Sequence, residues 1–451
     1  MSTDVVDDGP ARVGEEPAYG APVGLWRALE RLRPPGQLFR GSLWRSPLRG
    51  TWLTSVFASV LLVGLPIVIV TGLLSYIAYQ PQFAGNAFPS TTHGLHLPLF
   101  TWPTHPAWLY RLNEGLHVSL GLALIPVVLA KLWSVMPKLF SWPPARSLAQ
   151  VLERLSLALL VGSILFELST GVLNTQYDYS DLGFDFYTAH YYGAWVFIAS
   201  FVLHVGLKFP TMRRSLRSRR LRSELRTPLA DTVPEPPDVH GLVAQEPSAP
   251  TLSRRGLLGL VGGASLAVTA VTIGETIGPR STALLSPRGR SYGSGPTDFQ
   301  VNRTARSAQV TPRDTGPGWR LTVVGASTVS LSRDQLLAMP QHTASLPIAC
   351  VEGWSTVQTW SGVRLRELAR LAGTPDPQHA LVHSLEKAGV FARAVLNGGQ
   401  LTDGDSLLAL KVNGADLSAD HGYPARVIVP ALPGVHNTKW VARIELDGPL
   451  T

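Results

Sequence analysis

The sequence predicts a multi-domain fold, in which an α-helical transmembrane bundle of four spans plus one anchor helix is followed by an α+β domain. Three observations predict this fold. Charged residues make up only 16% of the 451 residues, against about 25% in an average soluble protein. No Asp, Glu, Lys or Arg occurs between Gly50 and Tyr110. From residue 296 onward the apolar runs become short and alternate with turn residues, which is typical of strands.

Five apolar runs are long enough to cross a bilayer, which takes about 17–25 residues. Four such runs in series exceed the helix lengths of a globular core. We therefore expect a four-span membrane domain over 50–210 and a fifth transmembrane helix over 253–280. The runs cover 53–79, 115–133, 155–175, 190–207 and 256–278.

The distribution of Lys and Arg predicts the orientation of the spans. Basic residues gather before the first run, between the second and third, and after the fourth, where 208–226 holds eight of them. The positive-inside rule then predicts a multi-pass protein of the cytoplasmic membrane, with the N-terminus inside and the C-terminal domain outside. The net charge of +8 indicates contact with membrane lipid, not nucleic acid.

Segments outside the spans have their own composition. Residues 1–49 are predicted to be a largely disordered cytoplasmic tail, and 211–252 a basic, Pro-rich extended linker. An aromatic belt at the span ends is predicted for Trp52, Trp102, Trp108, Trp133, Trp142 and Trp195.

Histidines within the apolar runs suggest a redox cofactor. His117 and His190 lie near the outer ends of the second and fourth runs. An imidazole nitrogen is a common axial ligand of haem iron, and a helix bundle can present two of them to one haem. We expect these two histidines to bind one haem b. A hydrogen-bonded packing role is the alternative for each, and His93, His96 and His105 are alternative ligands in the outer loop.

A second haem has only one candidate ligand. His204 follows His190 by fourteen residues, nearly four helical turns, so both share one helix face. The position fourteen residues after His117 is Lys131, so His204 lacks a histidine partner there. Glu167, inside the third run, suggests quinone binding, proton transfer or an internal hydrogen bond.

Four spans with this histidine placement resemble the membrane cytochromes b that serve hydrogenases, formate dehydrogenases and molybdoenzymes. The resemblance covers about residues 50–210. It implies that haem b exchanges electrons with quinone or quinol in the membrane.

The fifth run begins with a pair of arginines. The segment Ser253-Arg254-Arg255-Gly256-Leu257-Leu258 and the weakly apolar run after it resemble a twin-arginine translocation (Tat) signal. Such a signal implies export of a domain already folded around its cofactor. The alternative is the ordinary basic start of a membrane helix, and in both cases we expect the helix to remain as an anchor.

The C-terminal domain, 296–451, is predicted to be α+β. Strands are expected at 319–324, 380–383, 407–412, 426–429 and 440–444, and short helices at 365–372 and around 334–337. Cys350 is the only cysteine, which excludes an internal disulfide and a cysteine-ligated iron–sulfur cluster. A buried small hydrophobe or a metal thiolate are the two roles that remain for it.

Three segments of this domain resemble the sulfite oxidase family. They are Cys350-Val351-Glu352-Gly353-Trp354-Ser355, His421-Gly422-Tyr423-Pro424-Ala425-Arg426 and Gly434-Val435-His436-Asn437-Thr438-Lys439-Trp440. The resemblance implies a molybdenum–molybdopterin cofactor, with Cys350 as molybdenum ligand and catalytic residue. It also implies a molybdopterin pocket lined by Asn302, Ser384, His421, Arg426, His436, Asn437, Thr438 and Lys439.

The combination predicts a membrane-bound oxidoreductase with oxo transfer at molybdenum. The chain stops after the strand near residue 446, where sulfite oxidases continue into an immunoglobulin-like domain. In this it resembles the methionine sulfoxide reductases of the same family, and that resemblance implies reduction of an S- or N-oxide such as a methionine sulfoxide. The enzymatic alternative is a sulfite dehydrogenase that feeds electrons to quinone. A non-catalytic haem electron carrier is the alternative of another class. The oligomeric state is not predicted.

Overall fold

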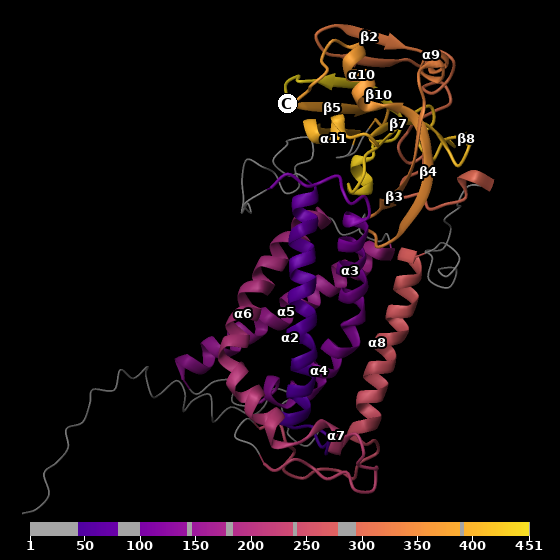
Figure 1. The fold of residues 1–451 in the computed structure, drawn as a ribbon. Coiled ribbons are helices and arrows are strands. Elements are labelled where there is room, and N and C mark those ends of the chain that lie inside the picture. Colours follow the sequence, from indigo (N-terminus) through magenta and orange to yellow (C-terminus); the bar gives the residue numbers. More distant parts are fainter. Residues whose placement is uncertain are drawn as a thin grey trace, which may run out of the picture.

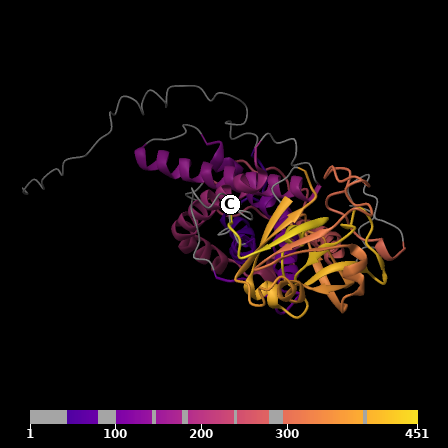
Figure 2. The ribbon, with the colours of Figure 1, turned by 90° about the horizontal axis from the view of Figure 1, so that it is seen from above.

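The computed structural model describes residues 44–79, 100–141, 147–176, 184–237, 241–277, 295–387 and 392–450. It consists of a long helical bundle with a sheet-containing domain stacked on one end (Figure 1). Viewed from above, the sheet domain lies over one side of the bundle (Figure 2). The helices of the bundle are α2 (Thr51–Ala78), α3 (Leu109–Ala123), α4 (Ile125–Leu139), α5 (Leu148–Gln176), α6 (Phe186–Ser218), α7 (Leu221–Glu224) and α8 (Arg254–Ile277).

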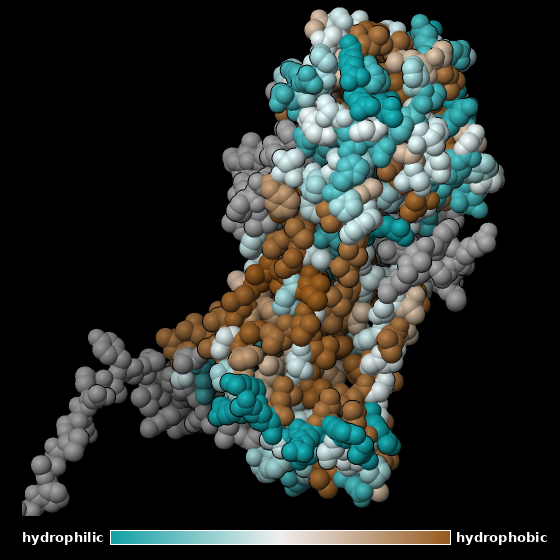
Figure 3. Space-filling model, in the orientation of Figure 1, coloured by the Kyte–Doolittle hydropathy of each residue, from teal (hydrophilic) through white to brown (hydrophobic). Residues whose placement is uncertain are grey.

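Five helical spans in the described part of the chain are long and apolar enough to cross a membrane, and each overlaps one of the predicted runs. Helices α3 and α4 together make one span, Leu109–Leu139. The junction falls at Leu124, just before Pro126, which has no N–H to continue the hydrogen-bond ladder. A broad apolar band covers the bundle between two hydrophilic ends (Figure 3). The helices are therefore compatible with a multi-pass membrane protein.

Helix α2 illustrates why this bundle is compatible with an apolar solvent. One of its faces is buried against the other helices and carries Leu53, Phe57 and Leu61, which are spaced four residues apart. On the opposite face Val63 is 66% exposed and Val70 54% exposed. A helix that is apolar on both its packed and its open face is typical of a membrane span.

The predicted linker differs from the structure in two respects. Helix α6 continues to Ser218, eight residues beyond the predicted end at 210, because nothing after Pro210 breaks the helix. The described residues of the Pro-rich segment that follows pack against the bundle. The Glu235 carboxylate accepts the N–H groups of Trp52 (2.9 Å) and Leu53 (3.3 Å), which satisfies donors at the start of α2. We call this end of the bundle, formed by 213–226, the Arg-rich end.

Two of the six belt tryptophans are buried inside the protein. Trp102 is 3% exposed, and its Nε1 donates to the Ala431 carbonyl of the sheet domain (2.8 Å). Trp52 Nε1 donates to the Arg219 carbonyl (3.0 Å). For these two residues the belt prediction is wrong, because each indole finds a partner on another segment of the protein. Trp142 lies outside the described residues.

The domain after residue 295 has the predicted α+β architecture, with two five-stranded sheets. The first has the order β2-β1-β10-β5-β6, and the second runs β3-β4-β7-β8 with β9 also paired to β7. Its strands are β1 (Leu321–Val324), β2 (Thr328–Leu331), β3 (His342–Ala349), β4 (Ser355–Arg364), β5 (His379–Ser384), β6 (Arg393–Asn397), β7 (Leu407–Val412), β8 (Ala415–Asp416), β9 (Arg426–Ile428) and β10 (Val441–Leu446). Its short helices are α9 (Arg333–Ala338), α10 (Leu365–Leu371) and α11 (Gly398–Thr402).

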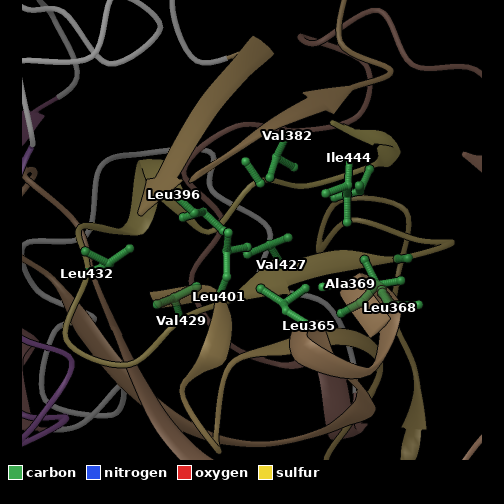
Figure 4. Packing of buried hydrophobic residues seen from close by; sticks show 14 of the residues in the cluster. Leu365, Leu368, Ala369, Val382, Leu396, Leu401, Val427, Val429, Leu432 and Ile444 are labelled. Carbon is green, nitrogen blue, oxygen red and sulfur yellow. The ribbon is translucent and has the colours of Figure 1, made fainter. Parts of the chain in front are cut away.

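The core of this domain is a continuous apolar cluster between the two sheets. Val382 and Ile444 of the first sheet and Val427 of the second lie around Leu365 and Leu368 of α10 (Figure 4). All five side chains are almost completely removed from solvent. Burial of this kind stabilises the fold by about 25 cal/mol per Å² of apolar surface, and it fixes the strand ends from which the functional loops leave.

Candidate functional site

The lone cysteine lies in a tight turn between β3 and β4. Ala349, the last residue of β3, pairs with Ser355, the first of β4. Within the turn, Cys350 N–H donates to the Trp354 carbonyl (2.9 Å) and Gly353 N–H to the Cys350 carbonyl (3.0 Å). Gly353 has φ +90°, a conformation that favours glycine. The thiol is 3% exposed and therefore has a fixed position.

A buried carboxylate lies next to the thiol. Cys350 Sγ donates to Glu352 Oε2 (3.3 Å), and Trp354 Nε1 donates to the same oxygen (2.9 Å). Glu352 belongs to the motif around the cysteine, but the sequence alone did not identify it as a site residue. The spacing Cys-x-Glu-x-Trp was the available signal.

A pocket above Cys350 brings together residues from four separate loops. Of the predicted pterin-binding residues, Asn302, His421, Arg426 and Lys439 line it together with the cysteine. Trp354 and Gly434, from the same motif segments, also line it. The remaining lining residues were not predicted; they are Phe299, Gln300, Val301, Ile348 and Asp420.

Two buried cations dominate the electrostatics of this pocket. Arg426 donates to the carbonyls of His421 (3.2 Å) and Asn437 (3.0 Å). Lys439 Nζ donates to Asn302 Oδ1 (3.2 Å) and to the carbonyls of Asp420 (3.0 Å) and Arg303. Burial lowers the pKa of Arg426 to about 9. Burial, with the charge of Arg426, lowers the pKa of Lys439 to about 7.

These cations fit an anionic ligand. Within the part of the chain that the structure describes, no carboxylate lies within 4.0 Å of either Arg426 or Lys439. A buried charge without a counter-ion is costly. A phosphate group of a pterin cofactor would supply the missing negative charge, through charge-assisted hydrogen bonds.

Polar atoms around the cations fit the same ligand. Among the described residues, Arg426 Nε, Asn437 Nδ2, Thr438 Oγ1 and Gln300 Oε1 are buried and have no hydrogen-bond partner. The Asn437 amide oxygen already accepts the Val429 N–H (2.8 Å), so its NH₂ group remains to donate. Buried polar groups are rarely left unsatisfied, and a polar ring system would satisfy these. The residues present therefore fit a molybdopterin.

The imidazole ring of His421 is neutral, with one ring nitrogen donating a hydrogen bond and the other accepting one. Its Nε2–H donates to the Phe299 carbonyl (3.1 Å), and its Nδ1 accepts from the Ser418 hydroxyl (2.7 Å). Burial and the charge of Arg426 lower the pKa of His421 to about 3. The imidazole thus adds shape and hydrogen bonding to the pocket without adding charge.

Four predicted pterin residues are not among the residues that line the pocket, namely Ser384, His436, Asn437 and Thr438. Ser384 Oγ donates to the Lys439 backbone carbonyl (2.8 Å). It therefore holds the backbone of the lysine and does not line the pocket. His436 is fully buried, and its ring lies 5.4 Å from the ring of Tyr79 at the end of α2. It therefore faces the helical bundle.

The two predicted haem ligands meet across a cavity in the bundle. His117 of α3 and His190 of α6 line a cavity of about 220 Å³, and their ring centroids are 6.4 Å apart. Gly72 of α2 makes room for this pair, because a Cβ there would lie 2.8 Å from His117 Cε1.

Hydrogen bonds fix the tautomer of both rings. His117 Nδ1 lies 3.0 Å from the Val68 carbonyl, which can only accept, so Nδ1 carries the hydrogen. His190 Nδ1 lies 2.9 Å from the Thr170 hydroxyl, which itself donates to the Phe166 carbonyl and so accepts from His190. Each ring is left with Nε2 as the nitrogen able to bind a metal, the usual arrangement for metal-binding histidines. The residues fit a bis-histidine haem.

Glu167 belongs to the same cluster. Its Oε2 lies 3.2 Å from His190 Nδ1, so of the three roles suggested for this acid the internal hydrogen bond has a visible partner. Of the alternative ligands in the outer loop, His105 is paired with Asp403 of the sheet domain (2.9 Å) and is not among the residues that line the cavity. His93 and His96 lie outside the described residues.

A second cavity, of about 230 Å³, lies toward the Arg-rich end. His204 and Lys131 both line it, and Lys131 Nζ donates to the Thr54 carbonyl (2.8 Å). At its rim Glu153 pairs with Lys138 (3.1 Å) and Lys208 (2.9 Å). His204 is the one histidine among the described residues that line this cavity, so the structure adds no histidine partner for it.

Comparison with known proteins agrees with the pocket. Residues 308–448 match the family model described as an oxidoreductase molybdopterin binding domain. The chain is 30% identical to mitochondrial sulfite oxidase of Mus musculus over 158 residues, 29% of each chain. It is 31% identical to the uncharacterized oxidoreductase YuiH of Bacillus subtilis over 131 residues, 28% of this chain and 64% of that protein.

A solved structure is also similar. It is the sulfane dehydrogenase SoxCD from Paracoccus pantotrophus. The alignment covers 29% of this chain and 38% of the SoxCD chain, at 24% sequence identity and a TM-score of 0.27. The chain thus spans less than a third of the length of the mouse sulfite oxidase that it matches. The family match covers the Cys350 turn, Arg426 and Lys439. Residues 308–448 therefore correspond to an oxidoreductase molybdopterin binding domain and are similar in sequence to sulfite oxidases.

Proposed function

We propose that this protein is a membrane-bound reductase of an S- or N-oxide, such as a methionine sulfoxide, that draws electrons from quinol through haem b. The observation that carries the proposal is the position of the Cys350 turn. Val351, the next residue, lines the cavity that His117 and His190 share. A thiolate suited to molybdenum and a histidine pair suited to haem thus meet at the junction of the sheet domain and the bundle.

The chemistry divides between the two sites. A molybdenum cofactor held by Cys350 would supply two-electron oxygen-atom exchange, and a haem would carry electrons singly. Reduction of a sulfoxide to a sulfide and water consumes two electrons and two protons, and oxidation of one quinol to quinone releases both. Arg426, Lys439 and His421 would hold the pterin, and the burial of the Cys350 turn would exclude water from the thiolate.

The second cavity, near the Arg-rich end, supports quinol as the electron donor. It is mostly apolar and has few convergent polar groups, as small-molecule sites usually do. Lys131 and His204 offer hydrogen-bond donors to two carbonyl groups. The cluster of Glu153, Lys138 and Lys208 provides titratable groups near the Arg-rich end for proton release. We assign this end to the cytoplasm and the sheet domain to the outside, with α8 as the export helix.

The test uses the haem spectrum of the detergent-purified protein. The haem is reduced chemically, the reductant is removed, and methionine sulfoxide is added without oxygen. Reoxidation of the haem in the wild type, and its loss in Cys350→Ala, is the expected result. A haem that stays reduced with every S- and N-oxide would overturn the proposed direction.

The second candidate function runs in reverse. The curated relatives include proteins named sulfite oxidase, which favours oxidation of sulfite with water to sulfate, two protons and two electrons. Sulfite added to the oxidised protein would then reduce the haem. The match to an oxidoreductase domain argues against the third alternative, a non-catalytic haem carrier.

A further inference from the structure

The Cys350 turn is clamped onto two helices of the bundle. Asn174 of α5 donates from Nδ2 to the Val351 carbonyl (2.7 Å). Gly353 packs against Val118 of α3 so closely that a Cβ there would lie 2.7 Å from Val118 Cγ1. A buried amide in a membrane helix is costly unless it is hydrogen-bonded. The bond to the Val351 carbonyl therefore accounts for an asparagine at position 174. The two contacts fix the turn from both sides.

Both clamps lie beside the histidine pair. Val118 directly follows His117. Asn174 stands one helical turn after Thr170, whose hydroxyl accepts the hydrogen bond from His190 Nδ1. Short rigid connections therefore run from Cys350 to both rings, through Val351 and α5 on one side and through Gly353 and α3 on the other.

Further contacts hold the rest of the domain in the same position. Arg111 Nε of α3 donates to Ser355 Oγ at the start of β4 (3.0 Å). Trp102 Nε1 donates to the Ala431 carbonyl (2.8 Å). The sheet domain would remain docked through these contacts if the Asn174 bond were lost, so that bond can be tested by itself.

We propose that the turn Cys350–Gly353 is the electron bridge between the two redox sites and that Asn174 is the residue that positions it. The inference rests on the proposed function, in which each turnover takes two electrons from quinol. Because a haem carries one electron at a time, the bridge is crossed twice for every sulfoxide reduced to sulfide and water. Asn174 acts on this step through Val351 and has no part in oxygen-atom exchange.

The test compares Asn174→Leu, which keeps the size of the side chain but removes the amide donor, with Ser163→Ala on the same helix. Among the residues that the structure describes, Ser163 bonds only its own helix, through the Leu160 carbonyl. We expect reoxidation of the reduced haem by methionine sulfoxide to slow about tenfold in Asn174→Leu, as small misplacements of reacting groups do, and to stay unchanged in Ser163→Ala. Turnover with reduced viologen, a soluble donor that reaches the sheet domain directly, should be the same in all three proteins.

A second measurement is independent of turnover. Amide hydrogen exchange over 348–356 of the full-length protein should quicken about tenfold in Asn174→Leu, because the turn loses an anchor. Asn174 also lines the cavity that His117 and His190 share, so haem reoxidation is compared per bound haem. Haem reoxidation and exchange that both match the wild type would overturn the bridge. Slowed viologen turnover would show damage to the active site instead, and would also overturn it. A wild type whose haem never responds to substrate would overturn the proposed function itself.

Discussion

Lys439 is buried against neutral oxygen atoms, and an anion in the pocket would stabilise its charge. In the cofactor-free protein its ammonium group is buried with hydrogen bonds to neutral oxygens, and burial holds its pKa at about 7. A pterin phosphate would turn this unfavourable burial into a charge-assisted contact.

The variant Lys439→Met should therefore have opposite effects on binding and on stability. Loss of a charged hydrogen bond worth about 2 kcal/mol lowers cofactor affinity about thirtyfold. Molybdenum per protein, measured by mass spectrometry, should fall, while the melting temperature of the cofactor-free protein should hold or rise. Lys387→Met, which removes an exposed partner of Asp314, is the matched control. Full molybdenum content in Lys439→Met would contradict the assignment.

His421 predicts a pH dependence of stability. Its pKa is about 3 in the folded protein, against about 6.5 in an unfolded chain. Between these values the unfolded chain binds a proton that the folded protein does not, so stability falls as the pH drops below about 6.5. Burial lowers the pKa of His436 to about 4, which acts in the same direction.

For the cofactor-free protein, we expect His421 to account for about 2 kcal/mol of lost stability between pH 7 and pH 5. His421→Gln keeps an amide donor for the Phe299 carbonyl but cannot be protonated. Its melting temperature should therefore fall less over this pH range than that of the wild type. Equal pH slopes for the two proteins would show that the imidazole is not held neutral.

At the scale of elements, glycines mark where helices approach most closely. A Cβ at Gly72 of α2 would lie 2.8 Å from His117, and one at Gly193 of α6 would lie 2.2 Å from Glu167 Oε1. Both glycines thus stand beside the histidine pair or the acid that contacts it. The cavity is shaped by these close approaches as much as by its histidines.

Gly72→Ala should displace the His117 ring and weaken haem binding about ten- to a hundredfold, the usual effect of disturbing the support of a metal ligand. Haem per protein, measured as the pyridine haemochrome, reports the loss. The control is Gly162→Ala on α5, where a Cβ would meet nothing within 4 Å. It should keep its haem. Equal haem content in the two variants would argue against His117 as a ligand.

At the scale of the whole molecule, charge separates the two ends of the bundle. The Arg-rich end lies opposite the sheet domain (Figure 1), and Arg254 at the start of α8 is 2% exposed and pairs with Glu224 there (3.4 Å). In the folded protein the first arginine of the twin pair is therefore part of the structure. If the twin arginines act as an export signal, the export machinery must recognise them before Arg254 becomes buried.

The proposed topology can be tested with single cysteines, because the native Cys350 is buried. Ser307→Cys on the sheet domain and Ser223→Cys at the Arg-rich end both place the new thiol at an exposed position. A membrane-impermeant maleimide added to intact cells should label the first variant, and should label the second only after permeabilisation. Labelling of Ser223→Cys in intact cells would reverse the topology.

Local sequence predicted the parts of the fold that rest on composition and periodicity. The five apolar runs lie in helices because no polar spacing interrupts them, and β7 was predicted residue for residue. Strand β3 was not predicted. It contains Pro347 and lies at the edge of its sheet, where a missing N–H is tolerated, and its first half is open to solvent.

What the sequence by itself determined is therefore the membrane-type helices, the position of the histidines along them and the Cys350 motif, because spacing and residue type are properties of one segment. Tertiary structure alone decided which segments meet. Only there does Ser384 support Lys439 from behind, Trp102 dock onto the sheet domain and Asn174 hold the Val351 carbonyl. Each of these contacts joins residues at least 55 positions apart, and no local pattern encodes a hydrogen bond between segments that only the packed core brings together.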